Sequence, residues 1–257
     1  MSPPLRLLLL VAALLLAEFR PAAAESLVVA LSTDHVEISS SFAGTGITVF
    51  GAIERDGAAL PERPVYDIVA VVRGPDETLV TRRKERVAGI WLNRAARTFL
   101  EMPSFYAVHS SRPLGEITNL TTLRRYQLGL GNLAFRSEGG FEAADDPAFE
   151  AAFVRLKKQA GLYRDAPYGI TFPGGSLFQT GVAIPANVPV GTYVVSVFLF
   201  ADGVMLATGN AAFGIGKTGF EQFTFDLAHE NGYLYGLICV LLALLTGWLA
   251  AVLFRRD

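Results

Sequence analysis

The chain has 257 residues, of which 51% are hydrophobic, and its formal net charge is only −2. Such a weak charge argues against nucleic acid or an anionic bilayer surface as the main partner, because both need a concentrated basic face. The single cysteine, Cys239, excludes a disulfide framework, haem attachment and cysteine-based zinc sites, so the fold must be held by its core.

The first predicted element is a secretory signal peptide at residues 1–24. Arg6 precedes an apolar run over 7–17, and the sequence Pro-Ala-Ala-Ala at 21–24 provides an Ala-x-Ala cleavage site. The apolar run has about a dozen residues, whereas a membrane span needs roughly 20, which leaves a retained N-terminal anchor as the alternative. In either case the following segment is expected outside the cytoplasm.

Residues 25–115 are expected to form an N-terminal β-sandwich unit. Short runs rich in β-branched and aromatic residues alternate with polar or Gly/Pro clusters, a pattern typical of an immunoglobulin-like sandwich, here without a disulfide. These runs lie at 27–31, 36–38, 47–53, 66–72, 79–87 and 89–92. The basic run Arg82-Arg83-Lys84, with Arg86 close by, is interpreted as the solvated face of a hairpin.

Residues 116–165 are predicted to form a helical insertion or connector. Apolar residues recur at helical spacing over 117–130 and 147–160. Asp145-Asp146 directly before Pro147 favours a helix start. The connector would join the N-terminal unit to a second β region.

Residues 166–231 are expected to form this C-terminal β unit and a juxtamembrane segment. Strand-like runs lie at 169–172, 177–184, 192–201 and 205–215. The run at 192–201 predicts a strand buried on both faces, and Asp202-Gly203 predicts a hairpin turn after it. The pattern leaves open whether the β region is one domain or two.

The last predicted elements are a transmembrane helix at 232–254 and a cytoplasmic tail at 255–257. The uncharged segment would reach about 35 Å as a helix, enough to cross a hydrocarbon core of about 30 Å. Positive charge at Arg255-Arg256 predicts that the tail stays in the cytoplasm. Small residues recur every four positions at Ala243, Gly247 and Ala251, a possible helix-packing face, although such residues are common in any span.

Three segments together resemble a known family. They are Gly-Ile-Thr-Val-Phe-Gly-Ala at 46–52, Ile-Pro-Ala-Asn-Val-Pro-Val-Gly-Thr-Tyr at 184–193, and the C-terminal span. They are similar to the alphaproteobacterial family of single-span transmembrane proteins of unknown function, over almost the whole chain. The resemblance implies a single-pass protein of the bacterial inner membrane, with a large periplasmic N-terminal domain. It implies no activity and transfers no site residue.

The pattern around the histidines does not define a catalytic or metal site. His35, His109 and His229 are isolated in sequence. Asp34-His35-x-Glu37 could place two metal ligands on one strand face, but an exposed polar edge is the simpler interpretation. His109-Ser110-Ser111 sets a base beside hydroxyls, yet adjacent side chains of a strand point apart.

The remaining polar motifs have structural interpretations. Asp145-Asp146 lacks the spaced oxygen ligands of a calcium loop and is better explained as a helix cap. Arg124-Arg125 is expected to face solvent rather than an anionic ligand. Phe-Pro-Gly-Gly-Ser at 172–176 lacks the lysine and the length of a phosphate-binding loop and is expected to be a turn between strands. No cofactor is expected.

The sequence therefore favours a mainly β, membrane-anchored periplasmic protein that acts as a non-catalytic binding or accessory module. Its partner would be another membrane or periplasmic protein, such as an envelope complex or a transporter. The alternative is a small-ligand-binding or sensor module, with a pocket between the two β units or beneath the helical insertion. A hydrolase is the third possibility.

Overall fold

Strands dominate the part of the chain that the computed structural model describes, which is residues 25–39, 42–54, 65–137, 147–217 and 227–253. The expected mainly β class is confirmed, together with a C-terminal apolar helix. The expected signal peptide, Asp145-Asp146 and the tail at 255–257 lie outside the described residues.

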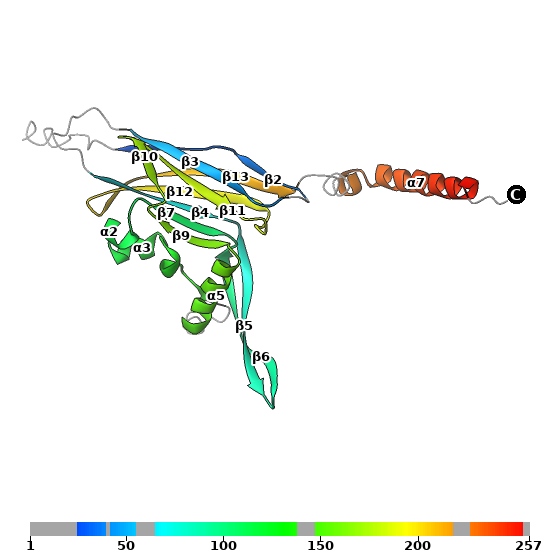
Figure 1. The fold of residues 1–257 in the computed structure, drawn as a ribbon, viewed down its shortest axis with the longest axis horizontal. Coiled ribbons are helices and arrows are strands. Elements are labelled where there is room, and N and C mark those ends of the chain that lie inside the picture. Colours follow the sequence, from blue (N-terminus) through cyan, green and yellow to red (C-terminus); the bar gives the residue numbers. More distant parts are fainter. Residues whose placement is uncertain (1–24, 40–41, 55–64, 138–146, 218–226, 254–257) are drawn as a thin grey trace, which may run out of the picture.

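Two sheets lie one above the other and share a core (Figure 1). The smaller sheet has the order β1 (Ser26–Leu31), β3 (Thr45–Glu54), β11 (Leu177–Ile184) and β10 (Thr171–Gly174). The larger has the order β2 (His35–Ile38), β13 (Val204–Lys217), β12 (Gly191–Ala201), β4 (Tyr66–Arg73), β7 (Tyr106–Ser110) and β9 (Tyr163–Pro167). Neighbouring strands are antiparallel except for β13 with β2 and β7 with β9.

Strands from the two expected β units are interleaved within these sheets. In the smaller sheet β11 pairs with β3, and in the larger sheet β12 lies between β4 and β13. Strands from residues 25–115 and 163–217 therefore build the sandwich together, and β9 begins inside the segment expected to be a helical connector. The helical connector is inserted between strands that share a sheet.

Helices cover the outer face of the larger sheet (Figure 1). They are α2 (Leu114–Ile117), α3 (Leu120–Arg125), the 3₁₀ turn η1 (Leu130–Asn132) and α5 (Pro147–Gln159). After α3, the ring of Tyr126 packs on Phe198 of β12 at 5.6 Å between centroids. This cover explains why β4 and the second half of β12 are buried on both faces, whereas β11 alternates buried and exposed residues.

A long hairpin projects away from the sandwich (Figure 1). It consists of β5 (Asp76–Val87) and β6 (Ile90–Pro103), with the short strand β8 (Arg136–Ser137) added to its base. We call residues 76–103 the arm. Its two-residue turn, Ala88-Gly89, has φ values of 49° and 88°, the left-handed pair that suits the twist of a tight hairpin. The runs at 79–87 and 89–92 were expected as strands of the N-terminal sandwich, with the basic run on a hairpin. They do form a hairpin, but in a sheet of its own outside the sandwich, and β6 continues to Pro103.

Most of the other predicted elements are confirmed. Asp202-Gly203 forms the expected turn between β12 and β13, with φ values of 50° and 82°. The turn expected at 172–176 is shorter than predicted, because residues 172–174 belong to β10 and only 175–176 form the turn to β11. Two helices occur in the connector where helical spacing predicted them, although the first is broken into α2, α3 and η1. Arg124 and Arg125 are exposed, as expected.

The C-terminal helix α7 (Gly232–Leu253) contains a 19-residue stretch, Gly232–Ala250, that is long and apolar enough to cross a membrane. No part of that stretch is buried against the rest of the chain as described. The helix therefore adds nothing to the core of the sandwich.

Gly51 marks the closest approach between β3 and its surroundings. A Cβ atom at this position would lie 2.1 Å from the carbonyl oxygen of Val28 and 2.6 Å from the ring of Phe178. We expect Gly51→Ala to lower the free energy of unfolding by about 1–3 kcal/mol, because the strands or the ring must move. Thermal and denaturant unfolding of the detergent-solubilised protein, followed by circular dichroism, measures this loss.

Gly46→Ala is the matched control, because it makes the same change in the same strand. The nearest atom to a Cβ there is the carbonyl oxygen of Val182, 4.0 Å away. Equal unfolding curves for the two variants would contradict the packing argument.

Candidate functional site

The three histidines do not converge. His35 is exposed on β2, His109 is buried on β7, and His229 is exposed in the helical residues 227–230. Within the described ranges, no three His, Cys, Asp or Glu side chains lie close enough together to hold a metal ion. The ring of His35 lies over Gly214 and Gly216 of the neighbouring strand, where a Cβ atom would approach it to 3.1 and 3.2 Å.

His109 instead forms a polar bridge between the two sheets. Its Nδ1 lies 2.8 Å from the hydroxyl oxygen of Thr180 on β11. That hydroxyl donates to the carbonyl oxygen of Gly169 at 2.8 Å, so its oxygen is free to accept from Nδ1–H. Gly169 is needed here, because a Cβ atom would lie 2.9 Å from Nδ1.

The environment of His109 keeps its imidazole neutral. Burial lowers the pKa of His109, and the positive charge of Arg164 lowers it further. With the proton on Nδ1, the other ring nitrogen, Nε2, is a buried acceptor without a partner among the described atoms. Among the described atoms His109 makes no hydrogen bond to Ser110 or Ser111, in line with the expectation that adjacent side chains of a strand point apart.

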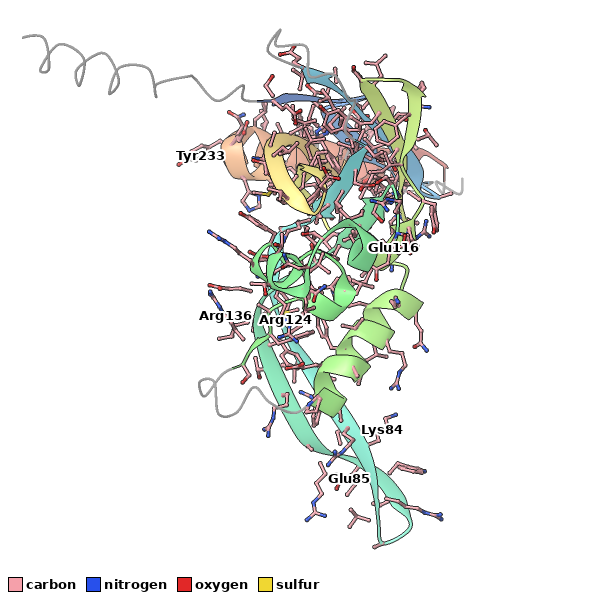
Figure 2. All side chains as sticks on the ribbon, turned by 90° about the vertical axis from the view of Figure 1, so that its left-hand side faces the viewer. Lys84, Glu85, Glu116, Arg124, Arg136 and Tyr233 are labelled. Carbon is pink, nitrogen blue, oxygen red and sulfur yellow. The ribbon has the colours of Figure 1, made fainter. Side chains whose placement is uncertain are left out.

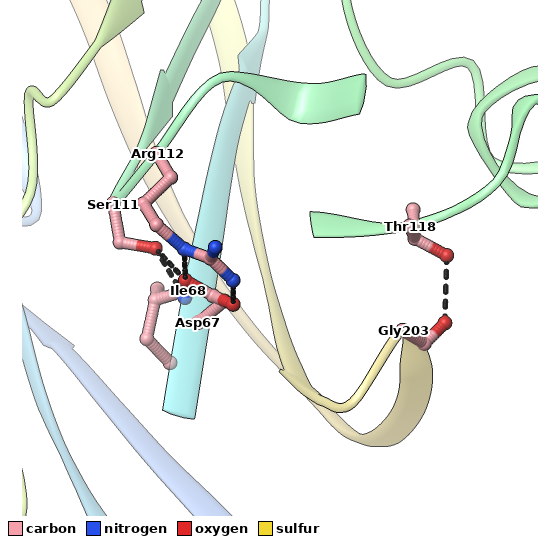
Figure 3. Close-up of polar contacts among 6 residues, drawn as sticks. All are labelled: Asp67, Ile68, Ser111, Arg112, Thr118 and Gly203. Atoms are coloured by element: carbon pink, nitrogen blue, oxygen red, sulfur yellow. Dashed lines mark hydrogen bonds and ion pairs between the residues drawn. The ribbon is translucent and has the colours of Figure 1, made fainter. Parts of the chain in front are cut away.

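A second polar cluster fixes the end of β7 to β4 (Figure 3). Asp67 is 3% exposed and accepts hydrogen bonds from the Ser111 hydroxyl at 2.8 Å and from Arg112 Nε at 2.9 Å. Burial opposes ionisation of Asp67, but the hydrogen bonds from Arg112 and Ser111 and the charge of Arg112 prevail and lower its pKa. Ser111 is thus occupied as a structural link.

Next to this cluster lies a polar hollow of about 630 Å³. It is lined by Arg112, by α2 and by the β12–β13 turn, which are joined where the Thr118 hydroxyl donates to the Gly203 carbonyl oxygen at 2.8 Å (Figure 3). Arg112 is already paired with Asp67. The other charged side chains that line the hollow are the carboxylates of Glu116 and Asp202, so it does not present a free cation to an anionic ligand.

A groove of about 620 Å³ runs beside α5. Leu133, Phe135 and Val154 provide apolar walls, while Arg155 and Asp165 provide charges. Although Asp165 keeps solvent contact, partial burial raises its pKa, and a hydrogen bond from the Leu130 backbone and the charge of Lys158 act in the opposite direction. The groove combines an apolar surface with charges of both signs, and its walls come from the helical connector itself, residues 130–165, rather than from the space beneath it.

The arm is the third candidate. Its base is held by an aromatic cluster in which Phe99 of β6 contacts Phe135 and Phe153 edge-on, at 5.2 and 5.4 Å between centroids. Further out, Arg83 and Arg97 lie over the ring of Phe149 of α5, at 5.6 and 5.9 Å. In Figure 2 the hairpin continues past α5 to its tip. Large apolar side chains are exposed there, namely Val87, Ile90, Trp91 and Leu92.

Sequence reasoning missed Thr180, Asp67 and the apolar tip. A serine or threonine facing a histidine from another sheet leaves no local signal in the sequence. The tip did leave one: Ile90-Trp91-Leu92 follows an Ala-Gly turn and lies between two basic segments. Ala243, Gly247 and Ala251 lie on α7; the described ranges place no second helix against Ala243 or Gly247, and the side chain of Ala251 lies outside them.

The His109 bridge predicts that Thr180→Val lowers the free energy of unfolding by about 1–3 kcal/mol. The variant keeps the shape of the side chain but leaves Nδ1–H and the Gly169 carbonyl buried without a partner. Denaturant unfolding in detergent measures the effect. Thr180→Ser is the control, since it retains the hydroxyl, and a serine variant as unstable as the valine variant would contradict the role of this hydrogen bond.

The Asp67 cluster predicts a dependence on pH. Because its pKa is lowered in the folded protein, Asp67 stabilises the fold above the pKa of the unfolded chain, roughly 3.9, and this contribution is lost as pH falls through the folded value. We expect Asp67→Asn to cost about 1–3 kcal/mol at neutral pH and progressively less below about pH 4.

Unfolding of Asp67→Asn and wild type, measured over a series of pH values, checks this expectation. Asp202→Asn makes the same chemical change at an exposed turn and serves as the control. A stability difference that did not vary with pH would show that the carboxylate charge is not the stabilising feature.

Comparison with known proteins agrees with these observations. The family model described as "Putative transmembrane protein (Alph_Pro_TM)" matches residues 26–256. No curated protein matches the chain. The matched region includes the whole described sandwich, the arm and α7. The chain therefore belongs to this alphaproteobacterial family of transmembrane proteins and has one candidate span near its C-terminus.

Proposed function

We propose that the protein is a non-catalytic binding or accessory module of an envelope protein complex, or of a transporter. It would be anchored by α7 in the bacterial inner membrane. The observation that carries the proposal is that the sandwich completes one continuous core while α7 and the tip of the arm stay exposed. Apolar surface of this extent, outside the core of the sandwich, is typical of regions that contact a membrane or a partner.

The positive charge of Arg255-Arg256 supports a cytoplasmic C-terminus. The apolar start of the chain, with its Ala-x-Ala site, supports export of the sandwich to the periplasm. In that compartment an immunoglobulin-like sandwich, as we interpret these sheets, offers the edges of β1, β10, β2 and β9 for pairing with an added strand.

Small residues on α7 support a second helix in the membrane as partner. Ala243, Gly247 and Ala251 are spaced by four residues in a continuous helix, so they share one face. The only hydroxyl near them, on Thr246, is satisfied within α7 by the carbonyl oxygens of Leu242 and Ala243, at 2.9 and 3.0 Å. This face would let another helix approach closely without burying an unpaired polar group.

A periplasmic small-ligand-binding role is the second candidate. The groove beside α5 favours it, because its volume suits a small molecule and its charged groups could orient one. The groove does not explain the exposed tip of the arm or the small-residue face of α7. We therefore place this role after the accessory role.

The accessory role predicts that Ala243→Leu with Gly247→Leu weakens capture of a membrane partner about tenfold, the equivalent of about 1.4 kcal/mol of helix packing. Leucine side chains at these positions would hold the two helices apart. Full-length protein is purified from native membranes in mild detergent, and the co-purifying proteins are quantified by mass spectrometry.

Leu245→Phe with Leu249→Phe is the matched control, since these residues lie on the opposite side of α7 at about 100° per residue. A partner retained by this control and lost by the leucine variant supports the proposal. A stoichiometric partner that co-purifies with both double variants would exclude the small-residue face as its binding site. The absence of any partner from the wild-type sample would favour the ligand-binding role.

A further inference from the structure

We propose that the tip of the arm docks on the anionic headgroup surface of the same bilayer that holds α7. The inference rests on the proposed function only in requiring that α7 is inserted in a membrane. Four observations carry it: the exposed apolar tip, the basic segment behind the tip, the rigid base of the arm, and the short connection between the sandwich and α7.

The tip is apolar on both faces of the hairpin. In the β5–β6 register Val87 lies opposite Ile90, and Arg86 lies opposite Trp91. Ile90 is 60% exposed and Trp91 67% exposed. Such side chains at the end of a solvated hairpin add nothing to the core of the protein. Tryptophan in particular is favoured at the boundary between lipid tails and headgroups, where its ring is apolar and its N–H can still find a partner.

The outer part of the arm, residues 80–99, has a charge opposite to that of the rest of the domain. The whole arm, residues 76–103, carries +2, because Asp76, Glu77 and Glu101 lie near its base. Residues 80–99 contain six Lys and Arg side chains and one glutamate, a net charge of +5. Residues 25–231 contain 18 Lys and Arg against 22 Asp and Glu, a net charge of −4, so the remainder carries −9. An anionic surface would attract the arm and repel the sandwich, which favours contact through the tip.

Several of these cations remain available for lipid. Glu85 forms ion pairs with Arg83 at 2.9 Å and with Arg94 at 3.8 Å. Within the described part of the chain, Arg82, Lys84 and Arg86 form no ion pair. Lysine and arginine near an anionic bilayer each contribute about 1 kcal/mol of attraction. An acidic protein surface could match the charge, but it would need a groove to accept the apolar tip, whereas a bilayer accepts it anywhere.

The geometry of the chain keeps the tip near the bilayer. Fourteen residues connect Lys217 of β13 to Gly232 of α7, and because residues 227–230 are helical, the connection can reach at most about 40 Å. The fourteen residues of β6 make an arm about 45 Å long, at about 3.3 Å per residue. The two lengths are comparable, so the tip can reach the surface while the tether keeps its effective concentration high. The aromatic base reduces the ordering cost of docking.

The test uses the full chain with Trp248→Phe, which leaves Trp91 as the only tryptophan. The protein is reconstituted in lipid nanodiscs of phosphatidylcholine alone or mixed with phosphatidylglycerol. Emission of Trp91 is then recorded with and without lipids brominated on their acyl chains. In the anionic discs we expect a blue-shifted emission that brominated lipid quenches, and in the neutral discs an emission typical of exposed tryptophan.

Arg82→Gln, Lys84→Gln and Arg86→Gln together should reduce the ratio of docked to undocked arm about 100-fold, since each cation contributes roughly fivefold. Arg124→Gln, Arg155→Gln and Arg164→Gln remove the same charge from exposed positions elsewhere and should preserve quenching. Ile90→Ser with Leu92→Ser should also abolish quenching, through the apolar contact alone. Circular dichroism confirms that each variant is folded.

Unquenched Trp91 in both kinds of disc, or equal quenching in both, would overturn the proposal. Shielding of Trp91 that requires a co-purified membrane protein would also overturn it, and would assign the tip to that protein. None of these results affects the capture experiment on α7, so failure of lipid docking and failure of the accessory role can be told apart.

Discussion

The pairing of β4 with β12 is the constraint on which the rest of the structure depends. These strands lie side by side at the centre of the larger sheet, although roughly 120 residues separate them in the chain. The chain between them leaves the sheet as the arm, returns in β7, leaves again as the helical connector, and returns in β9 before it enters the smaller sheet. The arm and the helical connector both arise from this excursion, and β11 comes back from it to pair with β3. Such non-local pairing is slow to form, because the loop must close before the contacts are gained.

Buried polar groups lie where the layers meet, and they fix how the layers sit on one another. His109 and Thr180 join the two sheets, and Asp67 joins β4 to the segment that leads into the helices. On the outer face, the hydroxyl of Tyr163 donates to the Pro103 carbonyl oxygen at 2.7 Å. Burial raises the pKa of Tyr163, so the phenol keeps the proton that this bond needs. Apolar contacts alone would allow the layers to slide over one another. These directional hydrogen bonds prevent such sliding.

The sequence predicted the local structure better than the assembly. The strands at 177–184 and 192–201, the helix at 147–160 and the turn at Asp202-Gly203 follow from periodicity and turn chemistry, which act over a few residues. The interleaving of the two β regions does not follow from these local patterns. Every strand could pair with several others, and the pairing is decided by the packing of the complete fold. For the same reason the local pattern could favour a polar edge over a metal site at Asp34-His35-x-Glu37, while the partner of His109 could not be named.

The net charge of the whole chain and the charge of the arm lead to different conclusions about binding to a membrane surface. A net charge of −2 argues against an anionic surface when it is spread evenly, but a hairpin concentrates basic residues of two strands on one projection. Arg94 and Arg97 of β6 join the run at 82–86 of β5 only because the turn at Ala88-Gly89 brings the strands together. Electrostatic attraction decays over about 8–10 Å in physiological salt, so a surface responds to the charges nearest to it and hardly to those of the distant sandwich. For a domain tethered beside a bilayer, the distribution of charge along the arm therefore matters more than the total.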